Sequence, residues 1–194
     1  MKRRPLNPAA MLAGLLVLAG CDTASPDRDP LGEPFPEVLG RDLDDREISL
    51  PGDRAGAPWI AMIGYVQAAQ FDIDRWMLGM LQVEAEVPVV EIPAVGGWFP
   101  ATFLQETIDD GMRAGIPRES WDGVITLYGD DARRVRDLTG TGQPRNARVL
   151  LLDREGTIRW FWDEGYSPAR LLELVRSEEH TSELQSRQYL VCRL

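Results

Sequence analysis

Residues 147–162 read ARVLLLDREGTIRWFW, and they decide the fold of this chain. Two apolar runs are joined by the four residues 153–156, the last of which is Gly. A connection of this length that contains Gly predicts an antiparallel hairpin. Ser167 and Pro168 then predict a helix start, because Ser is a good cap and Pro suits the first helical position. We therefore expect the domain to close with strand, strand and helix.

A strand–helix–strand unit precedes this hairpin. Residues 58–65 are a short, continuous apolar run, which is typical of a central buried strand. A strand over 87–92 follows a helix over 71–84, which we expect Asp72 to cap. The helix carries apolar residues at i, i+3, i+4, i+7 and i+8, which predicts one core-facing stripe: Ile73, Trp76, Met77, Met80 and Leu81.

Further segments extend this alternation. Residues 35–39 and 47–50 predict an opening hairpin. A helix from Pro100, a strand over 124–128 and a short helix capped by Asp130 or Asp131 fill the stretch before residue 147. The order predicts one α/β domain over residues 35–176. We expect a mixed sheet flanked by helices, with an N-terminal β-hairpin and an inserted strand–helix.

Composition excludes several classes of function. The chain has 194 residues and a formal net charge of −10, without the basic stripe of a nucleic-acid-binding protein. The chain has two cysteines, Cys21 and Cys192, and one histidine, His180, and all three lie near its ends. The body therefore lacks the residues for a dithiol site, a Cys–His nucleophile or a usual zinc site. We expect no metal and no cofactor.

The N-terminus has the pattern of a bacterial export signal. Lys2, Arg3 and Arg4 precede an apolar run over 9–20 that is shorter than the roughly 20 residues needed to span a bilayer. This pattern predicts a signal peptide over residues 1–20. The sequence Leu-Ala-Gly-Cys that ends at Cys21 resembles the lipobox of bacterial lipoproteins.

The lipobox resemblance implies that Cys21 is lipidated and that the chain is anchored outside the cytoplasm. Asp22 resembles a retention signal for the inner membrane, so we expect a periplasm-facing domain. Residues 22–34 are polar and contain three Pro, which predicts that the lipidated Cys21 and a flexible tether occupy residues 21–34.

The C-terminus changes character near residue 177. Residues 177–194 contain the only His of the chain and follow a helix that looks complete at residue 176. They also resemble a translated sequencing adapter found at the ends of unrelated predicted proteins. We expect a non-native or disordered tail, the alternative being a native amphipathic one.

The order of elements resembles the thioredoxin-like superfamily, and several stretches resemble the "ATP ten" family of ATP synthase assembly factors. The likeness covers residues 35–176. It implies an assembly factor whose client is a membrane protein complex. Its carrying residues are Trp76, Gly111-Met112-Arg113, Ile116-Pro117, the run Leu150–Trp160 and Gly165.

The redox members of the superfamily carry a Cys-x-x-Cys pair where this chain has Gln67 and Gln70. An amide cannot form the nucleophilic thiolate that this chemistry requires. The superfamily also places a cis-proline before its penultimate strand, and Pro144 is the nearest candidate. We therefore expect a thioredoxin-like scaffold without thiol chemistry.

Three segments are candidates for binding a protein partner. Gln67 and Gln70 lie at a helix start, where backbone N–H groups can bind a carbonyl or anionic group; the alternative is polar loop filler. Trp98 and Phe99 lie in a glycine-flanked loop. Trp160 and Trp162 share one strand face and form either a docking patch or packing beneath the last helix.

These features predict a membrane-anchored, redox-inactive thioredoxin-like binding or assembly factor for an envelope protein complex. One alternative is a thiol-reductase or peroxiredoxin-like enzyme, which the absence of cysteine from residues 22–191 disfavours. Another is a small-molecule-binding lipoprotein, which a closed pocket would support.

Overall fold

The computed structural model describes residues 25–96 and 101–191. These residues form a seven-stranded sheet in the order β2-β1-β5-β4-β3-β6-β7. The strands are β1 Val38–Asp42, β2 Glu47–Leu50, β3 Trp59–Gly64, β4 Val89–Val95, β5 Ile125–Tyr128, β6 Arg148–Leu152 and β7 Ile158–Trp162. The α-helices are α1 Gln70–Gln82, α2 Ala101–Gly115, α3 Gly129–Thr139 and α4 Pro168–Val191, and the 3-10 helices are η2 Gly52–Arg54, η3 Gln67–Ala69 and η4 Arg118–Gly123.

The predicted mixed α/β sheet is confirmed. Strand β3 pairs in parallel with β4 and antiparallel with β6, and β4 pairs in parallel with β5. The opening hairpin β1–β2 and the closing hairpin β6–β7 are both antiparallel. Strand β5, which belongs to the inserted strand–helix, joins the opening hairpin to the rest of the sheet through β1.

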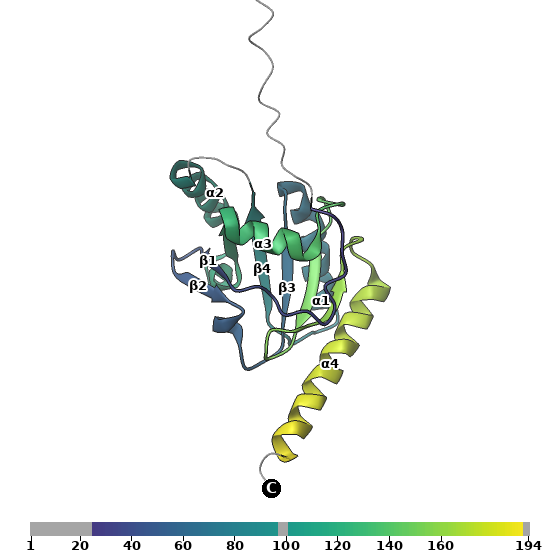
Figure 1. Ribbon diagram of the computed structural model, residues 1–194. Helices are drawn as coiled ribbons and strands as arrows, with labels where there is room; N and C mark the ends of the chain where they lie inside the picture. The colour runs from purple at the N-terminus through teal and green to yellow at the C-terminus, as the bar shows by residue number, and fades with distance from the viewer. Residues whose placement is uncertain (1–24, 97–100, 192–194) are drawn as a thin grey trace, which may run out of the picture.

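The sheet is covered on both faces, as a run of uniformly apolar central strands requires. Helix α3 crosses the front face in Figure 1 and packs Val135 and Leu138 onto one core cluster. Helices α1 and α4 contribute Trp76, Leu171 and Leu174 to the other core cluster. The β3 side chains alternate between these two cores.

Helix α1 is rotated relative to the predicted stripe. Ile73, Trp76 and Met80 are buried, but Met77 is 38% exposed and Leu81 is 72% exposed. Gly79 occupies the core-facing position instead, against the Leu171 and Tyr166 side chains. The prediction that Met77 and Leu81 face the core is therefore wrong, because packing against α4 needs a small residue at position 79.

The expected capping residues have other positions. Helix α1 has its N-cap at Ala69, and Asp72 lies buried inside its first turn. Helix α3 begins at Gly129 without a side-chain cap, which places Asp130 and Asp131 in its first turn. Acidic residues in a first turn still favour the helix through its dipole.

Residues 25–34, expected to be part of a flexible tether, pack along the domain. The Thr141 N–H donates to the Ser25 carbonyl at 3.0 Å, and the Gly142 N–H donates to the Asp27 carboxylate. Gly32 and Glu33 then exchange backbone hydrogen bonds with Ile158. The exposed edge of β7 offers unpaired backbone groups, and this segment satisfies them. Residues 25–34 therefore lie against the domain through named hydrogen bonds.

Helix α4 also differs from the expected C-terminus. It continues to Val191, so the expected helix end at residue 176 is wrong. Among the α4 residues up to 181, whose burial is described, the last buried one is Leu174, and Figure 1 shows the following turns extending beyond the sheet. Within the part of the chain that the structure describes, none of the helices has the length and apolarity that crossing a membrane requires.

Candidate functional site

The turn between β3 and α1 lies at the carboxyl end of a central strand. Strand β3 ends at Gly64, and the chain passes through Tyr65 and Val66 into η3 and then α1. No side chain caps the start of either helix. The turn itself engages the N–H groups where α1 begins, because the Ala69 N–H donates to the Val66 carbonyl and the Gln70 N–H donates to the Gln67 carbonyl.

The two glutamines of this turn have different surroundings. Both are exposed, but within the described residues the Gln67 side chain makes no hydrogen bond. The Gln70 amide donates to Asp74 at 3.0 Å. Burial raises the pKa of Glu91 on β4, and a hydrogen bond from Gln70 partly offsets this rise. Gln67 is thus available to a partner, whereas Gln70 is engaged by its own domain.

Tyr65 forms the rigid base of the turn. Its hydroxyl donates to the Val135 carbonyl at 3.1 Å and lies 2.5 Å from Thr139 Oγ1. The guanidinium groups of Arg136 and Arg148 lie 5.5 and 5.2 Å from its ring centroid, within cation–π range. Burial raises the pKa of Tyr65 to about 12.

Arg148 is fully buried beside Tyr65, and sequence reasoning missed it. Its Nη1 donates to the carbonyls of Gln143 and Asn146. Nothing in the apolar run 147–152 distinguishes this arginine from one at a strand end exposed to water. Its burial depends on the 141–147 loop folding over it.

Apolar side chains flank the turn on the outside. Val66 is 42% exposed and Phe71 is 75% exposed. Leu78 and Leu81 continue along the same helix and are also exposed. We call these four residues the α1 outer face. Grouped exposed apolar residues are typical of a contact surface.

Trp160 and Trp162 are occupied by contacts within the domain. The Trp160 and Trp76 rings meet edge to face, with centroids 6.1 Å apart. The Trp162 indole donates to the Gly165 carbonyl at 2.7 Å, and the Arg170 guanidinium lies 4.0 Å above its ring. Of the two interpretations of this strand, packing beneath the last helix describes the arrangement. Trp98 and Phe99 lie outside the described residues.

Two further candidates for chemistry are absent from the described ranges. The cis peptide bond found there is Leu50–Pro51, so Pro144 does not supply the cis-proline of the redox relatives. Residues 25–96 and 101–191 also contain no group of three or more His, Cys, Asp and Glu side chains that could hold a metal ion.

Comparison with known proteins yields likenesses of structure only. No family model matches the chain, and no curated protein matches it. A Sco-family cytochrome c oxidase assembly protein is similar over 78% of this chain and 96% of its own, at 13% identity and a TM-score of 0.53. A SCO1/SenC family lipoprotein from Bacillus anthracis is similar over 81% of this chain and 99% of its own, at 11% identity and a TM-score of 0.53.

A thiol peroxidase from Chromobacterium violaceum is also similar, over 81% of this chain and 91% of its own, at 11% identity and a TM-score of 0.51. Together with the sheet order, these likenesses define a protein with a thioredoxin-like fold. Its structural neighbours include a thiol peroxidase, a Sco-family cytochrome c oxidase assembly protein and a SCO1/SenC family lipoprotein.

Proposed function

We propose that this chain is a lipid-anchored, redox-inactive thioredoxin-like assembly factor for an envelope protein complex. The main supporting observation is the turn at the start of α1: where redox relatives need a thiolate, it presents Gln67, whose side chain makes no hydrogen bond to the described residues. Residues 22–191 contain no cysteine that could replace it. The turn therefore binds rather than exchanges disulfides.

Two likenesses support the assembly role and the anchor. Sco-family neighbours are cytochrome c oxidase assembly proteins, and the sequence resembles the ATP ten assembly factors. One neighbour is a lipoprotein, as the lipobox before Cys21 predicts for this chain. We place the domain on the periplasmic side of the inner membrane.

The docked N-terminal segment supports a client in the membrane. Ser25 is fixed against Thr141, and only three residues separate it from Cys21, so the Cα atoms of Cys21 and Ser25 lie at most about 14 Å apart. The 141–147 loop contacts Arg148, which lies against Tyr65 at the base of the turn. The anchor thus holds the carboxyl end of β3, where the Gln67 turn lies, close to the bilayer.

We assign the α1 outer face and the Gln67 amide to one client surface. Its occupant is an apolar segment of a membrane-complex subunit, whose backbone carbonyls accept hydrogen bonds from the Gln67 side-chain amide. Apolar contact supplies affinity, and the hydrogen bonds fix the register.

The test is co-purification of a membrane complex with the lipidated full-length chain in mild detergent. Val66→Asp combined with Phe71→Asp places two charges on the outer face, so we expect the complex to be lost. Leu172→Asp is the matched control, because Leu172 is a 47%-exposed leucine on α4. Equal recovery with both variants contradicts the proposed surface.

The competing enzyme function is tested separately. We expect the purified chain to show neither reduction of insulin disulfides nor peroxide turnover, because Cys192 is the only thiol left once Cys21 is lipidated. Turnover by either assay that persists in Cys192→Ser overturns the redox-inactive account.

The anchor has its own test. Cys21→Ser removes the sulfur that receives the lipid, so the chain should move from the membrane to the soluble fraction. Asp22→Ser keeps that sulfur and should leave the chain membrane-bound. Retention of the Cys21→Ser chain on washed membranes contradicts lipid anchoring.

A further inference from the structure

A second candidate site lies near β2, at the opposite edge of the sheet from β7. A cleft of about 660 Å³ opens between α2 and the outer strands β1, β2 and β5. Its floor includes Arg41, Thr126 and Tyr128 from the strands, and Glu106 and Asp109 line it from α2. Neither Gln67 nor the α1 outer face contributes to it.

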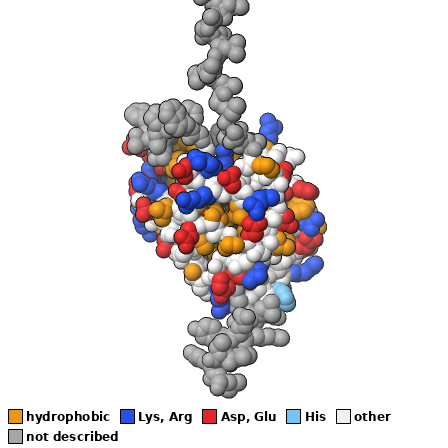
Figure 2. Space-filling model, in the orientation of Figure 1, with side chains coloured by type: hydrophobic (Ala, Val, Ile, Leu, Met, Phe, Trp, Pro, Cys, Tyr) orange, Lys and Arg blue, Asp and Glu red, His pale blue; other side chains and the backbone are white. Residues whose placement is uncertain are grey.

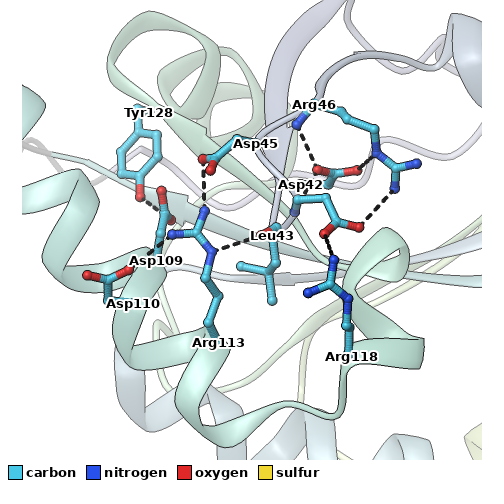
Figure 3. A network of polar contacts seen from close by, with 10 residues as sticks. Asp42, Leu43, Asp45, Arg46, Asp109, Asp110, Arg113, Arg118 and Tyr128 are labelled. Atoms are coloured by element: carbon cyan, nitrogen blue, oxygen red, sulfur yellow. Dashed lines mark hydrogen bonds and ion pairs between the residues drawn. The ribbon is translucent and has the colours of Figure 1, made fainter.

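The cleft is strongly acidic. Arg113, one of its two arginines, is held by Asp45 at 2.8 Å, by Asp110 at 3.1 Å and by the Leu43 carbonyl (Figure 3). This leaves Arg41 as the remaining cation of the lining. The carboxylates of the lining number six, namely Asp45, Glu47, Glu106, Asp109, Asp110 and Asp131.

The acidity of the cleft does not by itself identify a ligand. Two polar groups at its floor, the Asp109 carboxylate and the Thr126 hydroxyl, indicate which chemistry would bind there. Asp109 is 8% exposed, and its carboxylate accepts one hydrogen bond, from the Tyr128 hydroxyl at 2.9 Å, among the described residues. Figure 3 shows this pair beside Arg113. Burial raises the pKa of Asp109, as expected where a carboxylate lacks donors.

Thr126 is 1% exposed, and its hydroxyl has no hydrogen-bond partner in the part of the chain that the structure describes. Its neighbours Ile125 and Leu127 belong to the core cluster beneath α3. Because side chains alternate along a strand, Thr126 points to the opposite face, into the cleft. A buried hydroxyl without a partner is costly, and a bound polar group removes that cost.

We infer that this cleft binds an organic cation through its N–H donors, which reach the Asp109 carboxylate and the Thr126 hydroxyl while Glu106 and Glu47 balance its charge. A guanidinium or a primary ammonium group has this chemistry. A bare metal ion fits less well, because no three acidic side chains of the described residues converge on one point. The same cation can come from a free amine or from an Arg or Lys side chain of a protein.

Titration calorimetry on the full-length chain tests this inference, with agmatine and an arginine-containing peptide as the two probes. We expect saturable binding of at least one probe. Asp109→Asn should weaken it by about tenfold or more, because a hydrogen bond to a charged group is lost. Thr126→Val, which keeps the shape of the side chain, should weaken it about two- to tenfold without lowering the melting temperature.

The matched control is Asp74→Asn, which removes one exposed carboxylate from α1, outside the cleft. We expect it to leave binding unchanged. If the peptide binds more tightly than agmatine, the cation comes from a protein side chain. If agmatine binds more tightly, it comes from a small amine. The inference is overturned if neither probe saturates, if Asp74→Asn weakens binding as much as Asp109→Asn, or if folded Thr126→Val binds as the wild type does.

Discussion

Asp72 joins three separate parts of the chain through one buried carboxylate. Its two oxygens accept the Ala147 N–H at 2.9 Å and the Tyr166 N–H at 2.8 Å. It thereby ties α1 to the start of β6 and to the segment before α4. The sequence suggested a helix cap, because Asp at a helix start usually has that role. No sequence pattern near Asp72 predicts hydrogen-bond partners that lie 75 and 94 residues away.

Replacing Asp72 by Ala should therefore be severe. One buried and one partly buried N–H group would lose their acceptor, and we expect the free energy of unfolding to fall by about 2–4 kcal/mol. Urea denaturation measures this. Asp74→Ala, at an exposed carboxylate two residues on, should cost less than about 1 kcal/mol. Equal losses at both positions would mean that the Asp72 contacts contribute nothing specific.

Tyr65 makes stability depend on pH in the alkaline range. The pKa of Tyr65 is about 12 in the folded chain, against about 10 for an unfolded tyrosine. Between these values the folded state holds a proton that the unfolded state has lost, so stability falls as pH rises from 10 towards 12. The stability lost over this range amounts to at most about 3 kcal/mol.

The Tyr65→Phe variant isolates this effect. It should cost about 1 kcal/mol at pH 8, where the hydroxyl only donates a hydrogen bond. Above pH 10 it should lose stability less steeply than the wild type, because the titrating group is gone. Unfolding free energies of both chains at pH 8 and at pH 11 give the comparison. Parallel pH profiles would show that Tyr65 ionises as readily in the folded chain as in the unfolded one.

At the scale of the element, helix α1 shows what a periodic pattern can and cannot predict. The 3.6-residue period indicated a core stripe, and Trp76 lies at its centre with no exposed surface. The apolar residues Leu78 and Leu81 fit a second, overlapping stripe, so the sequence could not settle how far the helix is rotated. Contact with α4 settles it.

Substitutions in α1 should separate these two stripes. Trp76→Ala should cost about 3–5 kcal/mol, because it empties a fully buried site between Trp160 and Tyr166. Leu78→Ala should change stability by less than about 0.5 kcal/mol, since Leu78 is 60% exposed. Thermal and urea unfolding give both values. A large loss of unfolding free energy in Leu78→Ala would contradict the assignment of Leu78 to the exposed side of α1.

The last turns of α4 should be dispensable for stability. Beyond Leu174, the hydrogen bonds that Ser177 and Thr181 make run to carbonyls of their own helix, at Glu173 and Ser177. Ending the chain at Ser177 should thus lower unfolding free energy by less than about 1 kcal/mol. A larger loss in a differential scanning experiment would show that residues 178–194 are structural.

For the whole molecule, the order and type of elements could be predicted, whereas contacts between distant segments could not. Continuous apolar runs such as 58–65 and 147–152 identify central strands because both of their faces are buried. The docking of residues 25–34, the burial of Arg148 and the cleft over Thr126 each arise only when the chain has folded. Figure 2 likewise shows acidic and basic side chains interspersed over one face, with no single-sign patch that composition could have indicated.

The place of the Gln67 turn in the fold could be read from the sequence, whereas its use as a binding site stays a prediction. The turn at Gln67 and Gln70 follows from the fold, since the carboxyl end of a central strand meets a helix start there. That Gln70 is bound to Asp74 while Gln67 is not depends on side-chain packing. The exposure of Val66 and Phe71 beside the turn was not predicted, because it depends on how the turn and α1 pack against the sheet.

Site-specific photo-crosslinking in membranes tests the central claim, client binding without thiol chemistry, most directly. A photoreactive residue at position 67 of the lipidated Cys192→Ser chain should form an adduct with a membrane-complex subunit, and the same residue at position 172 should not. The account predicts that this adduct forms undiminished after all thiols in the sample are alkylated. An adduct that is lost when the thiols are alkylated, or that forms equally from both positions, would contradict client binding without thiol chemistry.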